Sequence, residues 1–418
     1  MLRPLALTGS QSAARTGARV YVIALLSGLP ADLVLAQQKL PPTLLEQVQA
    51  CILAQSRGDS PPLPGFTQKP ENAVTGDSAK RTVMPTQVMP TQEVAERCIF
   101  SVVMLHPNGS VRPDAGDRLA QLMRQTGAKM PRPQGQGQTT LSFQTQPGQK
   151  LYRVPVTIQK QQFSFLLDTG ASNTVIDHQI ARQLKLVGQP APPDLLGYVA
   201  VGQEPKLQSP ILYTLPPLTL GQTRVSQLRG LGLSTQQPPF SSDGILGLDF
   251  LSQFDLVIRP QQKSLSLLRP SAPVARGIPL KGSLGVMTTS AIAINGRGSY
   301  TFLLDTGAAI TTLSRPLSQR LGLKLKPQDG VQVMGLGGRI EARWSRLDSL
   351  ALQTHRLTNH DVLVADSQVF QTLGVDGVIG QDVLSQFDQH WRFGAPGALG
   401  VPDHGSLELV PVRQDVKL

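Results

Sequence analysis

The sequence has 418 residues, of which 40% are hydrophobic and 16% charged, and its formal net charge is +11. This composition is typical of a globular protein, and the length allows two or three domains with cores of their own. The basic residues are scattered and aromatic residues make up only 5%, so the sequence disfavours a nucleic-acid-binding surface. After the N-terminal segment, no stretch is long and apolar enough to cross a bilayer.

The N-terminal segment has the pattern of a targeting sequence. Its first 31 residues contain three arginines and no acidic residue, and the apolar stretch from Val20 to Leu29 follows the arginines. The sequence Leu33-Val-Leu-Ala36 then resembles a cleavage site. We expect residues 1–36 to be a signal peptide or targeting segment and the protein to be exported, to a periplasm or outside the cell. An organelle transit peptide and an uncleaved tether, giving membrane or wall association, are the alternatives.

A small helical module is predicted over residues 40–127, followed by a linker. Thr43 and Glu46 fit a capping box at the start of the first helix. The later segments with helical apolar spacing cover residues 93–104 and 114–124. Residues 128–147 are rich in Pro, Gly and Gln, which predicts a linker.

The two cysteines, Cys51 and Cys98, both lie in this module. They are a candidate disulfide in an oxidising compartment and two buried thiols in a reducing one. The sequence has no Cys-x-x-Cys pair and no Cys/His cluster, which disfavours a structural zinc site.

Residues 148–418 have a different pattern, in which short apolar runs alternate with turn residues. This pattern predicts many short β-strands. Within it, Phe165-Leu-Leu-Asp168-Thr-Gly-Ala171 recurs as Phe302-Leu-Leu-Asp305-Thr-Gly-Ala308. A second block, starting at Asp243 and containing Ile245-Leu-Gly247, recurs from Asp376 with Val378-Ile-Gly380. Two motifs that repeat in the same order indicate a duplicated unit, with lobes at 148–272 and 273–418.

The repeated Asp-Thr-Gly motif suggests paired carboxyl chemistry. An apolar strand that ends in this motif carries a carboxyl from a buried segment to a tight loop. If the two loops meet, Asp168 and Asp305 share a proton, because two like charges so close cannot both ionise readily. One carboxylate is then the general base on a water molecule, and the other carboxyl is the general acid. A duplicated turn in a β-rich binding protein is the competing interpretation.

On these motifs, residues 148–413 resemble the retropepsin/pepsin clan of aspartic peptidases. The resemblance implies a mainly β, bilobal acid-protease fold with two duplicated lobes, preceded here by the helical module. It implies that Asp168 and Asp305 are catalytic in an aspartic endopeptidase acting on peptides or proteins. It further implies that Thr169, Gly170, Thr306 and Gly307 support the active-site loops, and that Gly247 and Gly380 belong to a brace motif beneath them. Both halves lie in one chain, so we expect a monomer with an intrachain pseudo-dimer, although pairing of each lobe between chains remains an alternative.

The same family covers its substrate with a glycine-rich hairpin, the flap. Val333-Met-Gly335-Leu-Gly337-Gly338 is the candidate in the second repeat. In the first repeat, Leu196–Gly202 occupies the matching place, with Tyr198 as a residue that covers the cleft or, equally well, an exposed aromatic beside a turn. Flap closure excludes water and supplies backbone hydrogen bonds to an extended peptide.

Both Asp-Thr-Gly motifs continue with alanine, at Ala171 and Ala308, where pepsin-like enzymes often carry a hydroxyl residue. A hydroxyl there favours the charged carboxylate, so its absence predicts a dyad with a higher pKa and an optimum less acidic than that of pepsin.

We expect no cofactor and no metal. His355 and His360 lie five residues apart and Asp361 follows, but no third ligand has suitable spacing, so the pattern favours a polar strand or turn over a metal site. The main alternative function is a catalytically inactive module that binds peptide or cell wall on the same fold.

Overall fold

The structure is a computed structural model. It describes residues 43–57, 92–107, 112, 114–127, 132–145, 150–190, 210–235, 241–326, 330–397 and 401–412. The expected targeting segment and Tyr198, with the rest of its predicted flap, lie outside the described residues. Within them, no helix is long and apolar enough to span a membrane.

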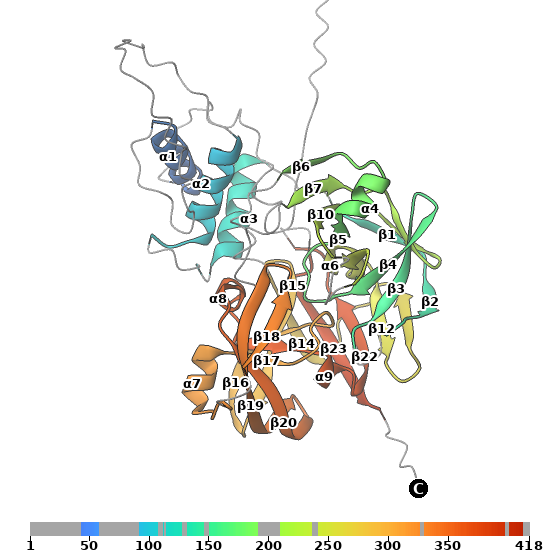
Figure 1. The fold of residues 1–418 in the computed structure, drawn as a ribbon. Coiled ribbons are helices and arrows are strands. Elements are labelled where there is room, and N and C mark those ends of the chain that lie inside the picture. The colour runs from blue at the N-terminus through green and yellow to red at the C-terminus, as the bar shows by residue number, and fades with distance from the viewer. Residues whose placement is uncertain are drawn as a thin grey trace, which may run out of the picture.

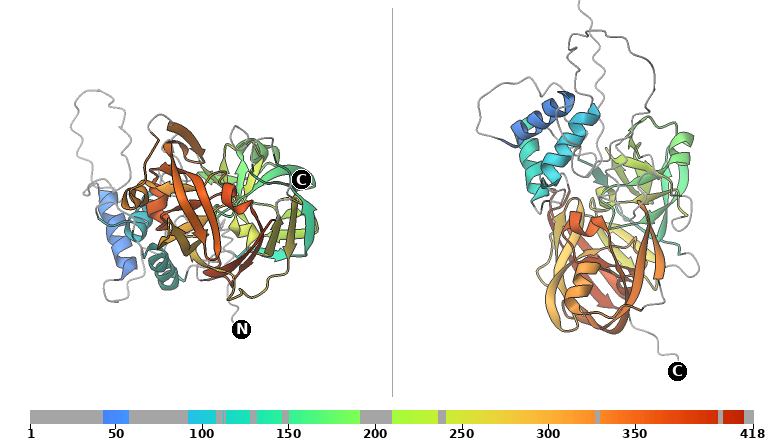
Figure 2. Two further views of the ribbon diagram at one scale, coloured as in Figure 1. Left: turned by 90° about the horizontal axis from the view of Figure 1, so that it is seen from below. Right: turned by 60° about the vertical axis from the view of Figure 1, so that its left-hand side comes forward.

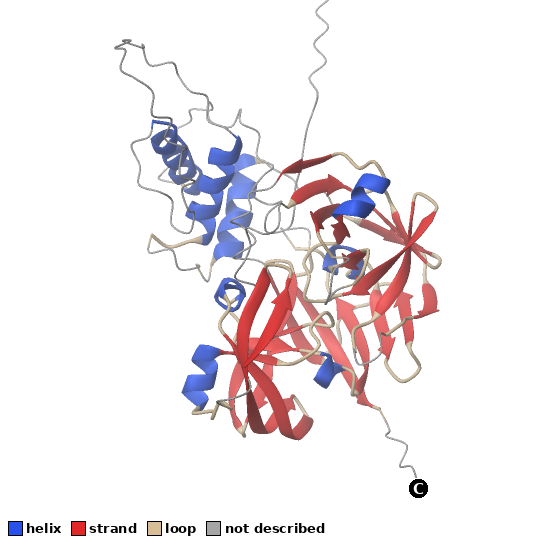
Figure 3. Cartoon of the chain, viewed as in Figure 1, coloured by secondary structure: helices blue, strands red, loops and turns tan. Residues whose placement is uncertain are grey.

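The chain folds into a small helical module followed by two β lobes (Figure 1). Figure 3 shows the three longest helices together on one flank, while strands form most of the rest, and Figure 2 shows the same grouping from two other directions. The mainly β fold behind a helical N-terminal module, as predicted from the sequence, is confirmed.

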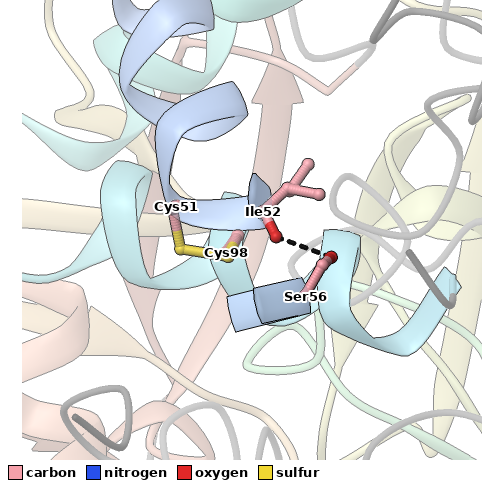
Figure 4. Close-up of a disulfide and its surroundings, with 4 residues drawn as sticks. All are labelled: Cys51, Ile52, Ser56 and Cys98. Atoms are coloured by element: carbon pink, nitrogen blue, oxygen red, sulfur yellow. Dashed lines mark hydrogen bonds between the residues drawn. A yellow bond between two sulfur atoms is a disulfide. The ribbon is translucent and has the colours of Figure 1, made fainter. Parts of the chain in front are cut away.

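The helical module consists of α1 (Leu44–Arg57), α2 (Gln92–Met104) and α3 (Ala115–Thr126). The predicted capping box forms at α1, where the Glu46 N–H donates to the Thr43 hydroxyl and the Thr43 N–H donates to the Glu46 carboxylate. Cys51 and Cys98 are joined by a disulfide between α1 and α2 (Figure 4). Because this bond closes a separation of 47 residues, it restricts the unfolded chain substantially.

The module shares one hydrophobic cluster with the first lobe. Leucines of the lobe, among them Leu212, Leu231 and Leu233, pack in this cluster with residues of all three helices. Leu284, in a hairpin turn of the second lobe, belongs to it as well. The module is therefore part of the protein's hydrophobic core.

The first sheet has ten strands in the order β1-β9-β8-β3-β4-β11-β5-β10-β7-β6. Their bounds are β1 Gln134–Gln136, β3 Arg153–Ile158, β4 Gln161–Leu167, β5 Val175–Asp177, β6 Gly188–Pro190, β7 Ile211–Thr214, β8 Leu218–Leu220, β9 Thr223–Ser226, β10 Arg229–Leu233 and β11 Gly244–Leu246. Two short helices, α4 (His178–Gln183) and α6 (Leu248–Leu251), follow β5 and β11.

The second sheet has thirteen strands in the order β18-β19-β20-β17-β21-β16-β15-β14-β23-β22-β12-β13-β2. Their bounds are β2 Thr139–Ser142, β12 Asp255–Arg259, β13 Ser264–Leu268, β14 Ile278–Ser283, β15 Val286–Ile294, β16 Arg297–Leu304, β17 Thr312–Ser314, β18 Gly330–Gly335, β19 Gly338–Leu352, β20 His355–Ala365, β21 Gly377–Ile379, β22 Phe387–Phe393 and β23 His404–Pro411. The helices of this lobe are α7 (Arg315–Leu321), α8 (Gln368–Leu373) and α9 (Gln381–Leu384).

The two lobes are joined by the shared strands at one end of the second sheet. β2, β13 and β12 come from before the predicted lobe boundary, and they continue directly into β22, β23 and β14 from after it. At the junction β12 and β22 run antiparallel, and Val257 pairs with His390. These two residues occupy the same place in the repeated blocks, so the pseudo-two-fold axis passes through this pair.

The segment expected to be a linker, residues 128–147, contains two strands. β1 pairs with β9 at the edge of the first sheet, and β2 pairs with β13 at the edge of the second. An edge strand is held through its backbone and can leave polar side chains in water, so its polar composition resembles that of a linker. The segment thus connects both sheets.

Candidate active site

Each lobe delivers one aspartate at the end of a buried strand. In β4 the last three residues, Phe165 to Leu167, are fully buried, and Asp168 follows them. β11 runs parallel to β4, and the Asp168 N–H extends this pairing by donating to Leu246 O at 3.1 Å. The second lobe repeats this arrangement with β16 and β21, where the Asp305 N–H donates to Ile379 O at 3.0 Å. Continuous apolar runs suit strands that are covered on both faces.

The structure brings the two aspartate loops together through their threonines. The Thr169 N–H donates to the Thr306 hydroxyl at 3.0 Å, and the Thr306 N–H donates to the Thr169 hydroxyl at 3.1 Å. Each hydroxyl also donates to a carbonyl of the opposite lobe, Thr169 to Leu304 O at 2.8 Å and Thr306 to Leu167 O at 3.0 Å. Both threonines are fully buried, so these four bonds form away from competing water.

The carboxyl groups face each other across this contact. Within each loop, Oδ1 accepts two backbone N–H groups: Asp168 from Gly170 and Ala171, and Asp305 from Gly307 and Ala308. A Cβ atom at Gly170 would lie 2.3 Å from Cγ of Asp305, and one at Gly307 would lie 2.3 Å from Cγ of Asp168. Glycine is therefore required at both places by the opposite carboxyl.

This arrangement favours one shared proton. Burial raises the pKa of Asp168 well above its usual range, and the charge of Asp305 and a side-chain hydrogen bond with it raise this pKa further. Burial also raises the pKa of Asp305, while hydrogen bonds from Asp168 and the loop amides oppose that rise. Asp168 and Asp305 are each half-buried, so part of each residue is accessible to solvent. The two carboxyls titrate together, so the shared proton belongs to the pair and not to either residue alone.

The brace motifs lie directly behind the loops. A Cβ at Gly247 would meet the Asn173 backbone at 2.4 Å, and one at Gly380 would meet the Ile310 backbone at 2.8 Å. After each glycine a short helix begins, and its first N–H groups donate to the loop: Leu248 to Ala171 O and Gln381 to Ala308 O, each at 2.8 Å. The brace glycines allow the helix N-terminus to approach the aspartate loop closely.

Two further aspartates, Asp249 and Asp382, hold the loops and were not predicted from the sequence. Asp249 Oδ1 accepts the Thr174 N–H and hydroxyl, both at 2.8 Å. Asp382 Oδ1 accepts the Thr311 N–H at 2.9 Å and its hydroxyl at 2.8 Å. The signal was present in the sequence, because both brace blocks carry Asp two residues after the glycine.

The predicted flap of the second repeat is a β-hairpin. β18 and β19 pair from Gly330↔Arg343 to Gly335↔Gly338, which places Gly337 in the turn. Ile340 and Ala342 of β19 form a small hydrophobic cluster with strand β20, and Ile310 of the Asp305 loop packs against this cluster. The hairpin is thus anchored beside the Asp305 loop.

The histidines considered as metal ligands are separated by their contacts. The His355 ring lies 5.0 Å from the Phe387 ring and is tilted against it, whereas His360 Nε2 lies 2.9 Å from Asp382 Oδ2. Asp361 binds Arg346 through both carboxylate oxygens. Among the residues that the structure describes, no group of three His, Cys, Asp or Glu could hold a metal ion.

Comparison with known proteins gives one family match for each lobe. Residues 154–253 match the family described as "gag-polyprotein putative aspartyl protease", and residues 291–383 match the family described as "Aspartyl protease". A solved structure titled EIAV protease complexed with the inhibitor HBY-793 is 26% identical over 23% of this chain and 83% of its own, with a TM-score of 0.19. No curated protein matches the chain. Each Asp-Thr-Gly motif thus lies within a match to an aspartyl protease family, and both lobes are similar to retropepsin-like aspartic peptidases.

Proposed function

We propose that the protein is an aspartic endopeptidase in which Asp168 and Asp305 together activate a water molecule. The main support is the reciprocal contact of the two loops, in which each glycine lies against the opposite carboxyl. The aspartyl protease matches support a peptide or protein as the substrate. The hairpin with Gly335, Gly337 and Gly338 is the proposed flap over that substrate.

The reaction needs one proton on the pair at the start. The ionised carboxylate takes a proton from water, whose oxygen attacks the scissile carbonyl carbon. The neutral carboxyl gives its proton to the carbonyl oxygen, which forms a tetrahedral diol. As the diol collapses, the C–N bond breaks and the leaving nitrogen takes a proton from the pair. At the same time one hydroxyl of the diol gives its proton to the pair and becomes the carbonyl oxygen of the product acid, so the dyad again holds one proton.

We further propose that the protein is exported and acts as a monomer. The N-terminal pattern supports export, and the Cys51–Cys98 disulfide supports an oxidising compartment. The contact between Thr169 and Thr306 supports a site completed within one chain. Sedimentation of the full chain at assay concentration tests the monomer, and N-terminal sequencing of the secreted protein tests the cleavage.

Isosteric variants of the dyad test the activity. We expect D168N and D305N each to lower kcat on a fluorogenic peptide library at least about a thousandfold, because general acid–base catalysis and water activation fail together. D348N, at an exposed position of β19, is the matched control and should retain wild-type kcat. Full activity in both dyad variants contradicts the proposal, and peptide binding without any turnover in the wild type would favour the inactive binding module.

A further inference from the structure

The two repeats differ at the second oxygen of their loop-holding aspartates. Asp382 Oδ2 lies 2.9 Å from His360 Nε2. Asp249 Oδ2 is buried and has no hydrogen-bond partner among the residues that the structure describes. Oδ1 of each aspartate accepts the N–H and hydroxyl of its loop threonine in the same way, so at these two aspartates the repeats differ in the contact made by Oδ2.

The topology identifies the residue that replaces His360 in the first repeat. β20 runs parallel to β17, with Leu363 opposite Thr312, and β10 runs parallel to β5, with Leu231 opposite Val175. The position three residues before each paired leucine is His360 in one lobe and Leu228 in the other. Leu228 is fully buried, so an apolar side chain takes the place of the imidazole.

A second polar contact is confined to the same lobe. Gln381 is buried, and its Nε2 donates to Thr306 O at 3.0 Å, within the Asp-Thr-Gly loop itself. The equivalent residue in the first repeat is Leu248, which has no side-chain donor. Two polar side chains that hold the Asp305 loop, His360 and Gln381, are thus replaced by leucines in the first repeat.

We propose that His360 is a positioning residue for the Asp305 loop, acting through Asp382 and Thr311. Its role in turnover rests on the proposed function, because it serves one half of the proposed dyad. Thr311 transmits the contact, since its hydroxyl donates to Asp382 Oδ1 and accepts the Gly380 N–H at 3.1 Å. The chain of contacts from the imidazole thus ends at both the loop and the brace glycine.

The charged groups around His360 favour Asp382 as its partner. Asp382 faces the imidazole from α9, and Asp361 is its neighbour on β20. Asp361 is engaged by Arg346 of β19 at 2.7 Å and by Lys326 at 3.9 Å. The His360 and Asp382 side chains are only 14% and 18% exposed, so solvent screens their contact less than it screens a surface ion pair.

The variant H360L tests the proposal because it gives the second lobe the apolar arrangement of the first. In the first lobe, Asp249 Oδ2 has no hydrogen-bond partner among the described residues. H360L likewise removes the imidazole contact of Asp382 Oδ2, so Asp382 is held less firmly as the acceptor for Thr311. We expect kcat of H360L to fall about tenfold relative to wild type, the equivalent of one hydrogen bond to a charged group.

Two variants separate positioning from general structural damage. H360Q keeps an N–H donor near Asp382, so its kcat should stay close to that of the wild type. H355L changes the histidine at the start of β20, whose ring lies 5.0 Å from the Phe387 ring, and its kcat should match that of the wild type. An unchanged kcat in H360L, or an equal loss in H360Q, overturns the proposal.

A readout without turnover keeps this test separate from that of the proposed function. Hydrogen exchange of the full chain should become about tenfold faster in H360L over residues 305–314 and remain unchanged over residues 168–177. Unchanged exchange over residues 305–314 contradicts positioning even if the enzyme is active. Faster exchange in a protein with no peptidase activity would support the positioning role and reject the proposed function.

Discussion

Thr169 and Thr306 each bury a hydroxyl that accepts the other's backbone N–H and donates to the strand preceding the other's aspartate. This exchange couples the lobes at the point where the two carboxyls meet. The geometry of the dyad and the association of the lobes therefore depend on the same four hydrogen bonds.

Removing one of these hydroxyls should destabilise the whole protein. T306A leaves the Thr169 N–H and Leu167 O buried without partners, so we expect the free energy of unfolding to fall by about 2–4 kcal/mol. T306S retains the hydroxyl and should lose about 1 kcal/mol, the contribution of a buried methyl group. Urea unfolding of both variants measures the difference, and equal losses would show that the hydroxyl contributes nothing.

The pH dependence of activity should reflect the shared proton. Activity requires one protonated and one ionised carboxyl, so it falls at low pH, where both are protonated, and at high pH, where both are ionised. Because burial and mutual repulsion raise the pKa of Asp168 well above its usual range, we expect the kcat/KM maximum above about pH 4. A profile from pH 2 to 8 tests this, after a check that preincubation at each pH is reversible. A maximum near pH 2 contradicts it.

Asp249 should make the protein less stable as pH rises. Burial raises its pKa from 3.8 to about 7, so the folded protein keeps a proton that the unfolded chain releases at lower pH. The stabilisation of the folded protein by this proton is fully present below about pH 4 and is lost as the pH rises through about 7. The loss is at most about 4 kcal/mol, from 1.36 kcal/mol per pKa unit.

The variant D249N removes this titration. The free energy of unfolding of wild type, measured in urea from pH 4 to 8, should decline more steeply than that of D249N. The pH dependence that the dyad adds to this free energy is the same in both proteins, so the difference reports Asp249 alone. Parallel curves would mean that the carboxylate stays ionised in the folded protein.

The flap turn should tolerate substitution poorly at Gly338. Its φ of 104° is unfavourable for any residue with a side chain. G338A should therefore cost about 1–3 kcal/mol in the closed hairpin and lower kcat/KM about tenfold. G330A, at the other end of β18, is the matched control, since a Cβ there meets no atom within 4 Å. Equal activity of the two variants would argue against a role for the hairpin in substrate binding.

The sequence was sufficient to predict those parts of the fold and the site that depend on residues close together in the chain. Apolar residues before Asp168 and Asp305 define the strands, and the glycines define the tight loops and the hairpin turn. The capping box at Thr43 was predictable for the same reason, because its hydrogen bonds join residues three positions apart.

Contacts that depend on register between distant strands were not predictable in this way. His360 meets Asp382 only because β20 and α9 converge behind Thr311, and the sequence around that histidine indicated only a polar strand or turn. Strands β1 and β2 were missed because they are held by their backbones at sheet edges, so their side chains show no apolar alternation. The targeting segment and the role of Tyr198 stay predictions.

The pairing of Val257 with His390 on the pseudo-two-fold axis has a consequence for how a peptide would enter the cleft. An assembly of two identical chains must place each residue on its axis opposite its own copy, and it then accepts an extended ligand equally well in either direction. Here unlike residues meet on the axis, and the loop residues Ser172 and Asn173 correspond to Ala309 and Ile310. The two directions of a peptide in the proposed site would therefore be inequivalent. The protein would lose the statistical advantage of a symmetric site, RT ln 2 or about 0.4 kcal/mol, and would bind the peptide with a defined polarity.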